Sequence, residues 1–133
     1  MITTRHLYGW AKETELWRQI ELSLKQALKR SEERYATFDY ETDSFVVELK
    51  SRPDLSADSY KTWLVPACKL EGVAGKTPVL FYYFGKDKSL WRCDPTTHDQ
   101  SQWMRHVPSW KSSQVHVWIP REAFTKVECL QTE

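Results

Sequence analysis

A strand-like stretch of the sequence carries an acid and a base two residues apart. The stretch is FVVELKSR, residues 45–52, and it contains Glu48 and Lys50. Because successive side chains of a β-strand alternate between its faces, both groups point to the same face. A carboxylate beside an ammonium group suits metal-assisted hydrolysis, since the acid can hold a cation and the lysine can orient water or offset charge in the transition state.

Asp39 joins Glu48 and Lys50 on this face if the preceding segment forms a hairpin with that strand. Runs rich in aromatic and β-branched residues flank the short polar segment 42–44, which predicts a hairpin turn there. The register would set Asp39 opposite Val46 or directly opposite Glu48. The sequence therefore predicts two carboxylates and a lysine on one side of the hairpin.

Two carboxylates placed in this way repel each other. At about 5 Å and an effective dielectric constant of about 20, the repulsion is roughly 3 kcal/mol. Either one carboxyl group keeps a proton and its pKa rises, or a divalent cation lies between the two. Hard oxygen ligands favour magnesium or manganese over zinc. Both possibilities remain open from the sequence, and Mg²⁺ or Mn²⁺ is the cation expected.

A third acid, Glu13, falls on the apolar stripe of a helix predicted over residues 10–30. Apolar residues recur there at three- and four-residue steps: Trp17, Ile20, Leu24 and Ala27 or Leu28. Glu13 points with this stripe, whereas Glu15 points to water. An acid near the positive end of a helix is also favourable by itself, so Glu13 is either a ligand or an ordinary first-turn acid.

The rest of the chain predicts one more short helix and several strands. Phe45, Val47 and Leu49 would form the core side of the hairpin. Residues 66–76 are expected to form a short helix with proline at its start and glycine near its end. Further strands are expected at 78–84, 89–93 and 115–120, with a turn-rich segment at 53–60, a long loop at 95–113 and a helical turn at 121–124.

Length and composition indicate one soluble globular domain over residues 1–133. Hydrophobic residues make up 41% of the chain and charged residues 28%, so it can bury a core. The 7 Trp and 6 Tyr exceed the needs of such a core, and some are expected to form a stacking surface. The net charge of +1 argues against nucleic acid as a partner unless a bound cation neutralises acidic side chains.

Neither the apolar pattern nor the cysteines indicate export. No apolar run approaches the roughly 18 residues of a membrane-spanning helix, and no signal-like segment follows Met1. The three cysteines are scattered, which fits a reducing compartment better than a disulfide framework. We therefore expect an intracellular, cytoplasmic protein, in the host cytoplasm if the protein is viral.

The order helix, hairpin, helix and strand resembles the PD-(D/E)xK nuclease fold, and its start resembles the archaeal Holliday junction resolvases. Their first helix carries a Gly-x-x-x-Glu-x-Glu-Leu pattern, which here runs from Gly9 to Leu16 and contains Glu13. Their Glu-x-Lys motif, followed by Ser-Arg, matches the segment from Glu48 to Arg52. The resemblance covers roughly residues 9–84 in element order and is specific only at these two motifs.

The chain departs from the family pattern near the hairpin turn. Phe38 stands where the name-giving proline would be, and the segment between Asp39 and Glu48 is short. Asp43 is therefore an alternative to Asp39 as the metal ligand.

This resemblance implies a restriction-endonuclease-like α/β domain, with an αβββαβ core and a mixed central sheet flanked by helices. Glu13, Asp39, Glu48 and Lys50 would be the active-site residues. Asp39, Glu48 and the carbonyl of Leu49 would hold Mg²⁺ or Mn²⁺, and Glu13 would bind a second metal ion or position its water shell. Lys50 would orient the attacking water or offset charge.

The implied activity is a divalent-metal-dependent DNA endonuclease, either structure-selective or sequence-specific. Arg52, Lys61 and Lys69 would contact the phosphates of DNA, and a homodimer would allow both strands to be cut. The alternative is a catalytically inactive module that keeps the fold and binds nucleic acid or protein. Enzymes of RNA or of single-stranded ends also remain open.

Overall fold

Nine strands form two sheets in this computed structural model, which describes residues 15–31, 38–107 and 114–128. The larger sheet has the strand order β1-β2-β3-β5-β6-β9, and the smaller sheet has the order β4-β8-β7. The strands of the larger sheet are β1 Lys29–Arg30, β2 Tyr40–Glu41, β3 Phe45–Arg52, β5 Thr77–Phe84, β6 Ser89–Cys93 and β9 Thr125–Lys126. Those of the smaller sheet are β4 Thr62–Pro66, β7 Met104–His106 and β8 His116–Pro120. The 3-10 helices are η1 Ala67–Leu70, η2 Pro95–Thr97, η3 Gln100–Gln102 and η4 Arg121–Ala123.

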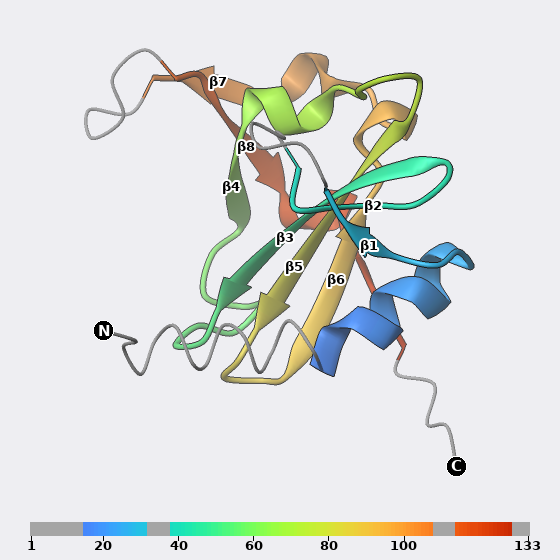
Figure 1. Cartoon of the computed structure of the whole chain (residues 1–133). Helices are drawn as coiled ribbons and strands as arrows, with labels where there is room; N and C mark the ends of the chain where they lie inside the picture. The colour runs from blue at the N-terminus through green and yellow to red at the C-terminus, as the bar shows by residue number, and fades with distance from the viewer. Residues whose placement is uncertain (1–14, 32–37, 108–113, 129–133) are drawn as a thin grey trace, which may run out of the picture.

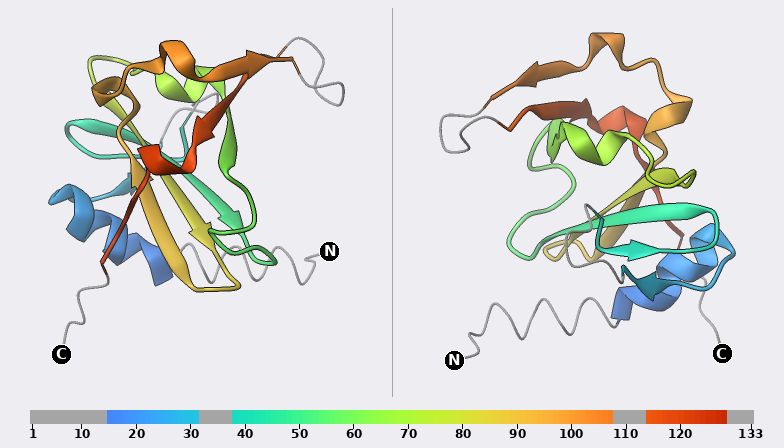
Figure 2. Two further views of the ribbon diagram at one scale, coloured as in Figure 1. Left: turned by 180° about the vertical axis from the view of Figure 1, so that it is seen from behind. Right: turned by 45° about the horizontal axis from the view of Figure 1, so that its top comes forward.

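The larger sheet lies between one α-helix and the smaller sheet. The helix covers residues 15–24 and packs on one face, while β4, β7 and β8 lie on the other side (Figure 1, Figure 2). Two apolar cores result. Leu16, Ile20 and Leu24 of the helix belong to the first core, and Trp63 and Val65 of β4 belong to the second.

Strand β5 separates these two cores. Its even-numbered residues from Leu80 to Phe84 face the smaller sheet, and its odd-numbered residues from Val79 to Tyr83 face the helix. A continuous apolar run is typical of a strand that is covered on both faces. β5 pairs in parallel with β3. The chain must therefore cross over between them, which residues 53–76 do through β4 and η1.

The helix ends at Leu24, so the predicted extension to about residue 30 is wrong. Lys25 has a φ of 58°, which is incompatible with α-helical geometry. Gln26 then turns toward the hairpin, where its Oε1 accepts hydrogen bonds from Thr42 Oγ1 at 2.6 Å and from the Ser44 N–H at 3.1 Å. The early end of the helix places Gln26 where it closes the hairpin turn.

The smaller sheet is absent from the sequence prediction. Residues 62–66 form β4, and the segment 95–113, expected to be a long loop, contains β7 and two 3-10 helices. The helix expected over 66–76 is reduced to η1. Trp63 and Val65 do alternate with less buried neighbours, but five residues of alternation are too few to identify a strand without its partner β8.

Four further predicted elements agree with the structure to within one residue. β5, β6, β8 and η4 lie at 77–84, 89–93, 116–120 and 121–123, and the segment 53–60 is made of turns. These segments carry the longest apolar runs or the clearest turn residues of the chain.

The architecture is α+β, which corrects the expected α/β class. The mixed central sheet is confirmed, but the described residues contain one α-helix, and the smaller sheet covers the face where another helix was expected. The described part of the chain has no helix long and apolar enough to span a membrane.

The packing of the helix can be tested with two substitutions in the same turn. Ile20 is 1% exposed and Leu22 is 38% exposed. We expect Ile20→Ala to lower the free energy of unfolding by about 2–5 kcal/mol, since it leaves a cavity against the sheet. Leu22→Ala should change it by less than about 0.5 kcal/mol. Urea denaturation measures both, and equal losses would contradict this packing.

Candidate functional site

The β2–β3 hairpin turns at residues 42–44, as the sequence predicts. Its register pairs Tyr40 with Val47. The preceding residue, Asp39, is therefore aligned with Glu48, and directly opposite residues of an antiparallel pair share a face. Of the two registers considered from the sequence, the one that opposes Asp39 to Glu48 is present.

The two faces of β3 divide as the alternation predicts. Val47 is fully buried on the helix side, and Phe45 and Leu49 pack against the same core. Glu48 and Lys50 lie on the other face. That face is also covered at Glu48, which is 4% exposed and is contacted by Lys69 of η1, so the acid and the base do not simply face water.

Glu48 is a buried carboxylate held between two lysines. Its exposure is 4%, its Oε2 lies 3.3 Å from Lys50 Nζ, and its Oε1 lies 3.0 Å from Lys69 Nζ. Lys69 therefore partners Oε1 through its charge and a side-chain hydrogen bond, as Lys50 partners Oε2 through its charge. Burial raises the pKa of Glu48, the charge of Asp39 raises it further, and the two lysines oppose the rise.

Lys69 reaches Glu48 from η1, in the crossover between β3 and β5. Its side chain is 14% exposed, and its Nζ also lies 5.4 Å from the ring centroid of Phe38. The sequence suggests Lys69 as a phosphate contact but gives no sign of the pairing with Glu48. That pairing depends on how β4 and η1 fold over β3, which local pattern does not reveal.

Asp39 completes the charged group at the edge of the hairpin. It is exposed, and its Oδ2 accepts a hydrogen bond of 3.2 Å from the Leu49 N–H. This bond holds the carboxylate against β3, beside Glu48. Asp43, the alternative ligand, is exposed in the turn beyond β2, four residues from Asp39, the position aligned with Glu48.

The oxygen ligands that this site offers suit a hard cation, but they are few. Asp39 and Glu48 supply carboxylate oxygens, and both oxygens of Glu48 lie within 3.3 Å of a lysine ammonium group. Within the described ranges, no group of three or more His, Cys, Asp or Glu side chains could hold a metal ion. Glu13, the remaining predicted acid, lies outside the described residues. The described acids therefore provide two ligands, to which a backbone carbonyl or water would have to be added.

The predicted phosphate contacts lie at different distances from this group. Arg52 follows Lys50 on the same face of β3, and its guanidinium lies 5.8 Å from the ring centroid of Tyr82. Lys61 is exposed just before β4, between residues that line a cavity beside Arg52. Lys69 is already engaged with Glu48. Arg52 and Lys61 are therefore the two that a phosphate chain could reach without displacing Glu48.

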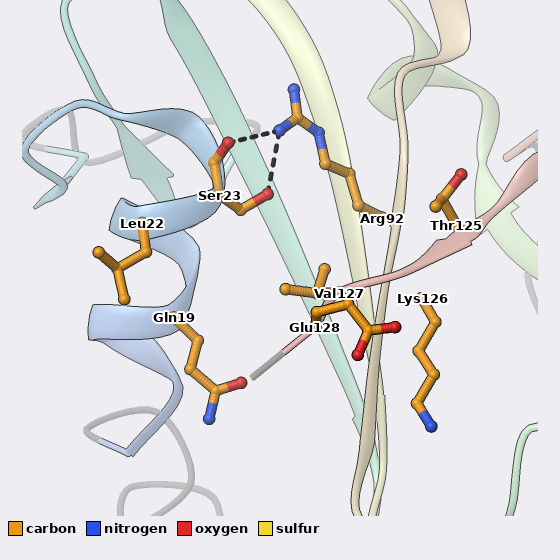
Figure 3. Close-up of a pocket in the computed structure, with 8 residues that line it drawn as sticks. All are labelled: Gln19, Leu22, Ser23, Arg92, Thr125, Lys126, Val127 and Glu128. Atoms are coloured by element: carbon orange, nitrogen blue, oxygen red, sulfur yellow. Dashed lines mark hydrogen bonds between the residues drawn. The ribbon is translucent and has the colours of Figure 1, made fainter. Parts of the chain in front are cut away.

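Another cavity, of about 370 Å³, lies between the helix and β9 and has a different character (Figure 3). Its arginine, Arg92, binds Asp94 through Nε and Nη2 and donates from Nη1 to the carbonyl and hydroxyl oxygens of Ser23. Arg92 thus ties β6 to the last turn of the helix. These bonds give it a structural role rather than a role in phosphate binding.

Comparison with known proteins identifies no relative of this chain. No family model, no curated protein and no solved structure matches this chain.

The environment of Glu48 has a consequence for stability that can be measured without any ligand. Because the folded state raises the pKa of Glu48, it binds this proton more tightly than the unfolded chain does. The resulting stabilisation is present at low pH and is lost as the pH rises through the raised pKa. Glu48→Gln lacks this dependence.

We therefore expect the melting temperature of Glu48→Gln, relative to that of the unchanged protein, to rise between about pH 4 and about pH 7. Thermal denaturation in EDTA would show the trend. A difference that stays constant, or that moves the other way, would contradict a raised pKa.

Proposed function

We propose that this chain is a divalent-metal-dependent endonuclease that hydrolyses phosphodiester bonds in DNA. The observation that carries the proposal is the buried carboxylate of Glu48, which is aligned with Asp39 across the hairpin and contacted by Lys50. Ionisable groups with perturbed pKa values and specific charged partners cluster at functional sites. A buried carboxylate is costly to remove from water, and its oxygens are useful as cation ligands.

The proposal includes membership of the PD-(D/E)xK superfamily, close to the Holliday junction resolvases of archaea. Its support is the order of a helix, a hairpin that carries Asp39 and Glu48, and a following strand parallel to β3. In the crossover, β4 and η1 replace the expected helix. The support therefore comes from the sheet and from the residues on β3.

Each residue of the proposed site would have its own role in hydrolysis. Asp39, Glu48 and the carbonyl of Leu49 would hold Mg²⁺ or Mn²⁺, with Glu13 as a further acid. Such an ion, when bound, lowers the pKa of a bound water and polarises the scissile phosphate. Lys50 would orient the attacking water or neutralise charge that develops on the phosphate oxygens. It is well placed, since it contacts Glu48 and remains partly exposed.

The cationic residues would hold the substrate. Lys69 would exchange its contact with Glu48 for a phosphate oxygen once a cation neutralises that acid, and Arg52 and Lys61 would bind phosphates farther along the strand. Affinity should then fall as salt concentration rises. A two-fold dimer would present two such sites and allow cleavage of both strands of a duplex or junction.

Cleavage of supercoiled plasmid and of a four-way junction tests the activity. We expect cleavage with Mg²⁺ or Mn²⁺ and none in EDTA. Glu48→Gln and Lys50→Ala should each lower the rate by about a hundredfold or more, because each removes a group that acts in the transition state. Glu71→Gln, an exposed acid just after η1, is the matched control and should cleave normally. Full activity in Glu48→Gln would remove the assignment.

A non-catalytic DNA- or protein-binding module is the second candidate. It is favoured by one observation, namely that Lys50 and Lys69 already neutralise Glu48. In such a module the three side chains would be a structural ion-pair group. DNA binding without cleavage, unaffected by Mg²⁺, would support this reading over the nuclease.

A further inference from the structure

We infer that a cavity beside the proposed active site binds an unpaired nucleobase. The cavity has a volume of about 380 Å³ and lies between the end of β3 and the strands β4, β5 and β8. A volume of this size is in the range of pockets for small molecules. The choice of ligand rests on the proposed function, but the binding can be measured without cleavage.

The position of the cavity relates it to the acidic site. Arg52 lines the cavity and lies four residues after Glu48 on the same face of β3, which corresponds to about 13 Å along the strand. A nucleic acid strand with one phosphate near Glu48 and Lys50 therefore passes this cavity with a neighbouring nucleotide.

The walls of the cavity are mainly aromatic. Tyr60, Trp63, Tyr82 and Trp118 line it, and the guanidinium of Arg52 lies over the ring of Tyr82. Tyr60 is 60% exposed, which is unusual for a side chain of this size and leaves its ring available. Aromatic rings and arginine planes are the groups on which unpaired bases stack in nucleic-acid-binding proteins.

One polar group of these rings donates no hydrogen bond within the described chain. The Tyr82 hydroxyl donates to the Leu64 carbonyl at 2.9 Å, and Trp118 Nε1 donates to His106 Nδ1 at 2.7 Å. Trp63 Nε1, in contrast, is buried and donates to no group in the described chain. An unsatisfied buried donor is unusual in a folded protein, and the residue that carries it lines the cavity.

The charge at the cavity distinguishes a nucleotide from an apolar partner. Arg52 is the charged residue among those that line it, no acid lines it within the described ranges, and the exposed Lys61 lies between Tyr60 and Thr62. A positive rim around aromatic walls matches a base attached to a phosphate chain. A purely apolar peptide would bring no negative charge to either cation.

The experiment compares three labelled duplexes by fluorescence anisotropy in EDTA, where no cleavage occurs. One duplex carries a central unpaired nucleotide, one carries an abasic residue at that position, and one is fully paired. We expect the unpaired nucleotide to bind about tenfold more tightly than the abasic residue. Tyr60→Ala and Arg52→Gln should abolish this preference, whereas Tyr60→Phe should keep it. Arg18→Gln, an exposed arginine on the helix, is the charge control and should keep it too.

Two results would overturn the inference. One is equal binding of the unpaired and abasic duplexes, or no binding of either. The other is a preference that persists in both Tyr60→Ala and Arg52→Gln while their melting temperatures are normal. The outcome is separate from that of the nuclease assay. A preference for the unpaired nucleotide in a protein that does not cleave DNA would support the base-binding cavity and contradict the proposed nuclease activity. Cleavage without such a preference would support the nuclease and contradict the base-binding cavity.

Discussion

The burial of the Glu48 carboxylate is the constraint on which the rest of the site depends. A charge removed from water is tolerated only when opposite charges or hydrogen bonds compensate for the lost hydration. Lys50 supplies one such charge from the same strand, and Lys69 supplies another from the crossover. The crossover thus has two effects, since it allows β5 to pair in parallel with β3 and it brings a second ammonium group to the acid.

This arrangement connects the fold with the proposed chemistry. The hairpin register sets Asp39 beside the buried Glu48, and the smaller sheet supplies Trp63 and Trp118 to the walls of the aromatic cavity. Electrostatic interactions strengthen around a buried carboxylate, and under the proposed function a divalent cation would replace an ammonium group at Glu48. The even-numbered face of β3 would then carry metal ligand, lysine and substrate contact in order: Glu48, Lys50 and Arg52.

The site was more predictable from the sequence than the fold around it. The alternation along residues 45–52 and the polar turn at 42–44 are local signals, and they give the face and nearly the register of Glu48. The end of the helix is not predictable from local pattern, because it depends on hydrogen bonds that the distant turn donates to Gln26. The smaller sheet was missed for the same reason, since β4 is recognisable as a strand only beside β8.

The most direct test of the central claim, that Asp39 and Glu48 together form a divalent cation site, is calorimetric titration with Mn²⁺ in the absence of DNA. We expect the unchanged protein to bind the ion, Asp39→Asn and Glu48→Gln to lose binding, and Asp43→Asn to keep it. Unchanged uptake in Asp39→Asn, or no uptake by the unchanged protein, would contradict the claim.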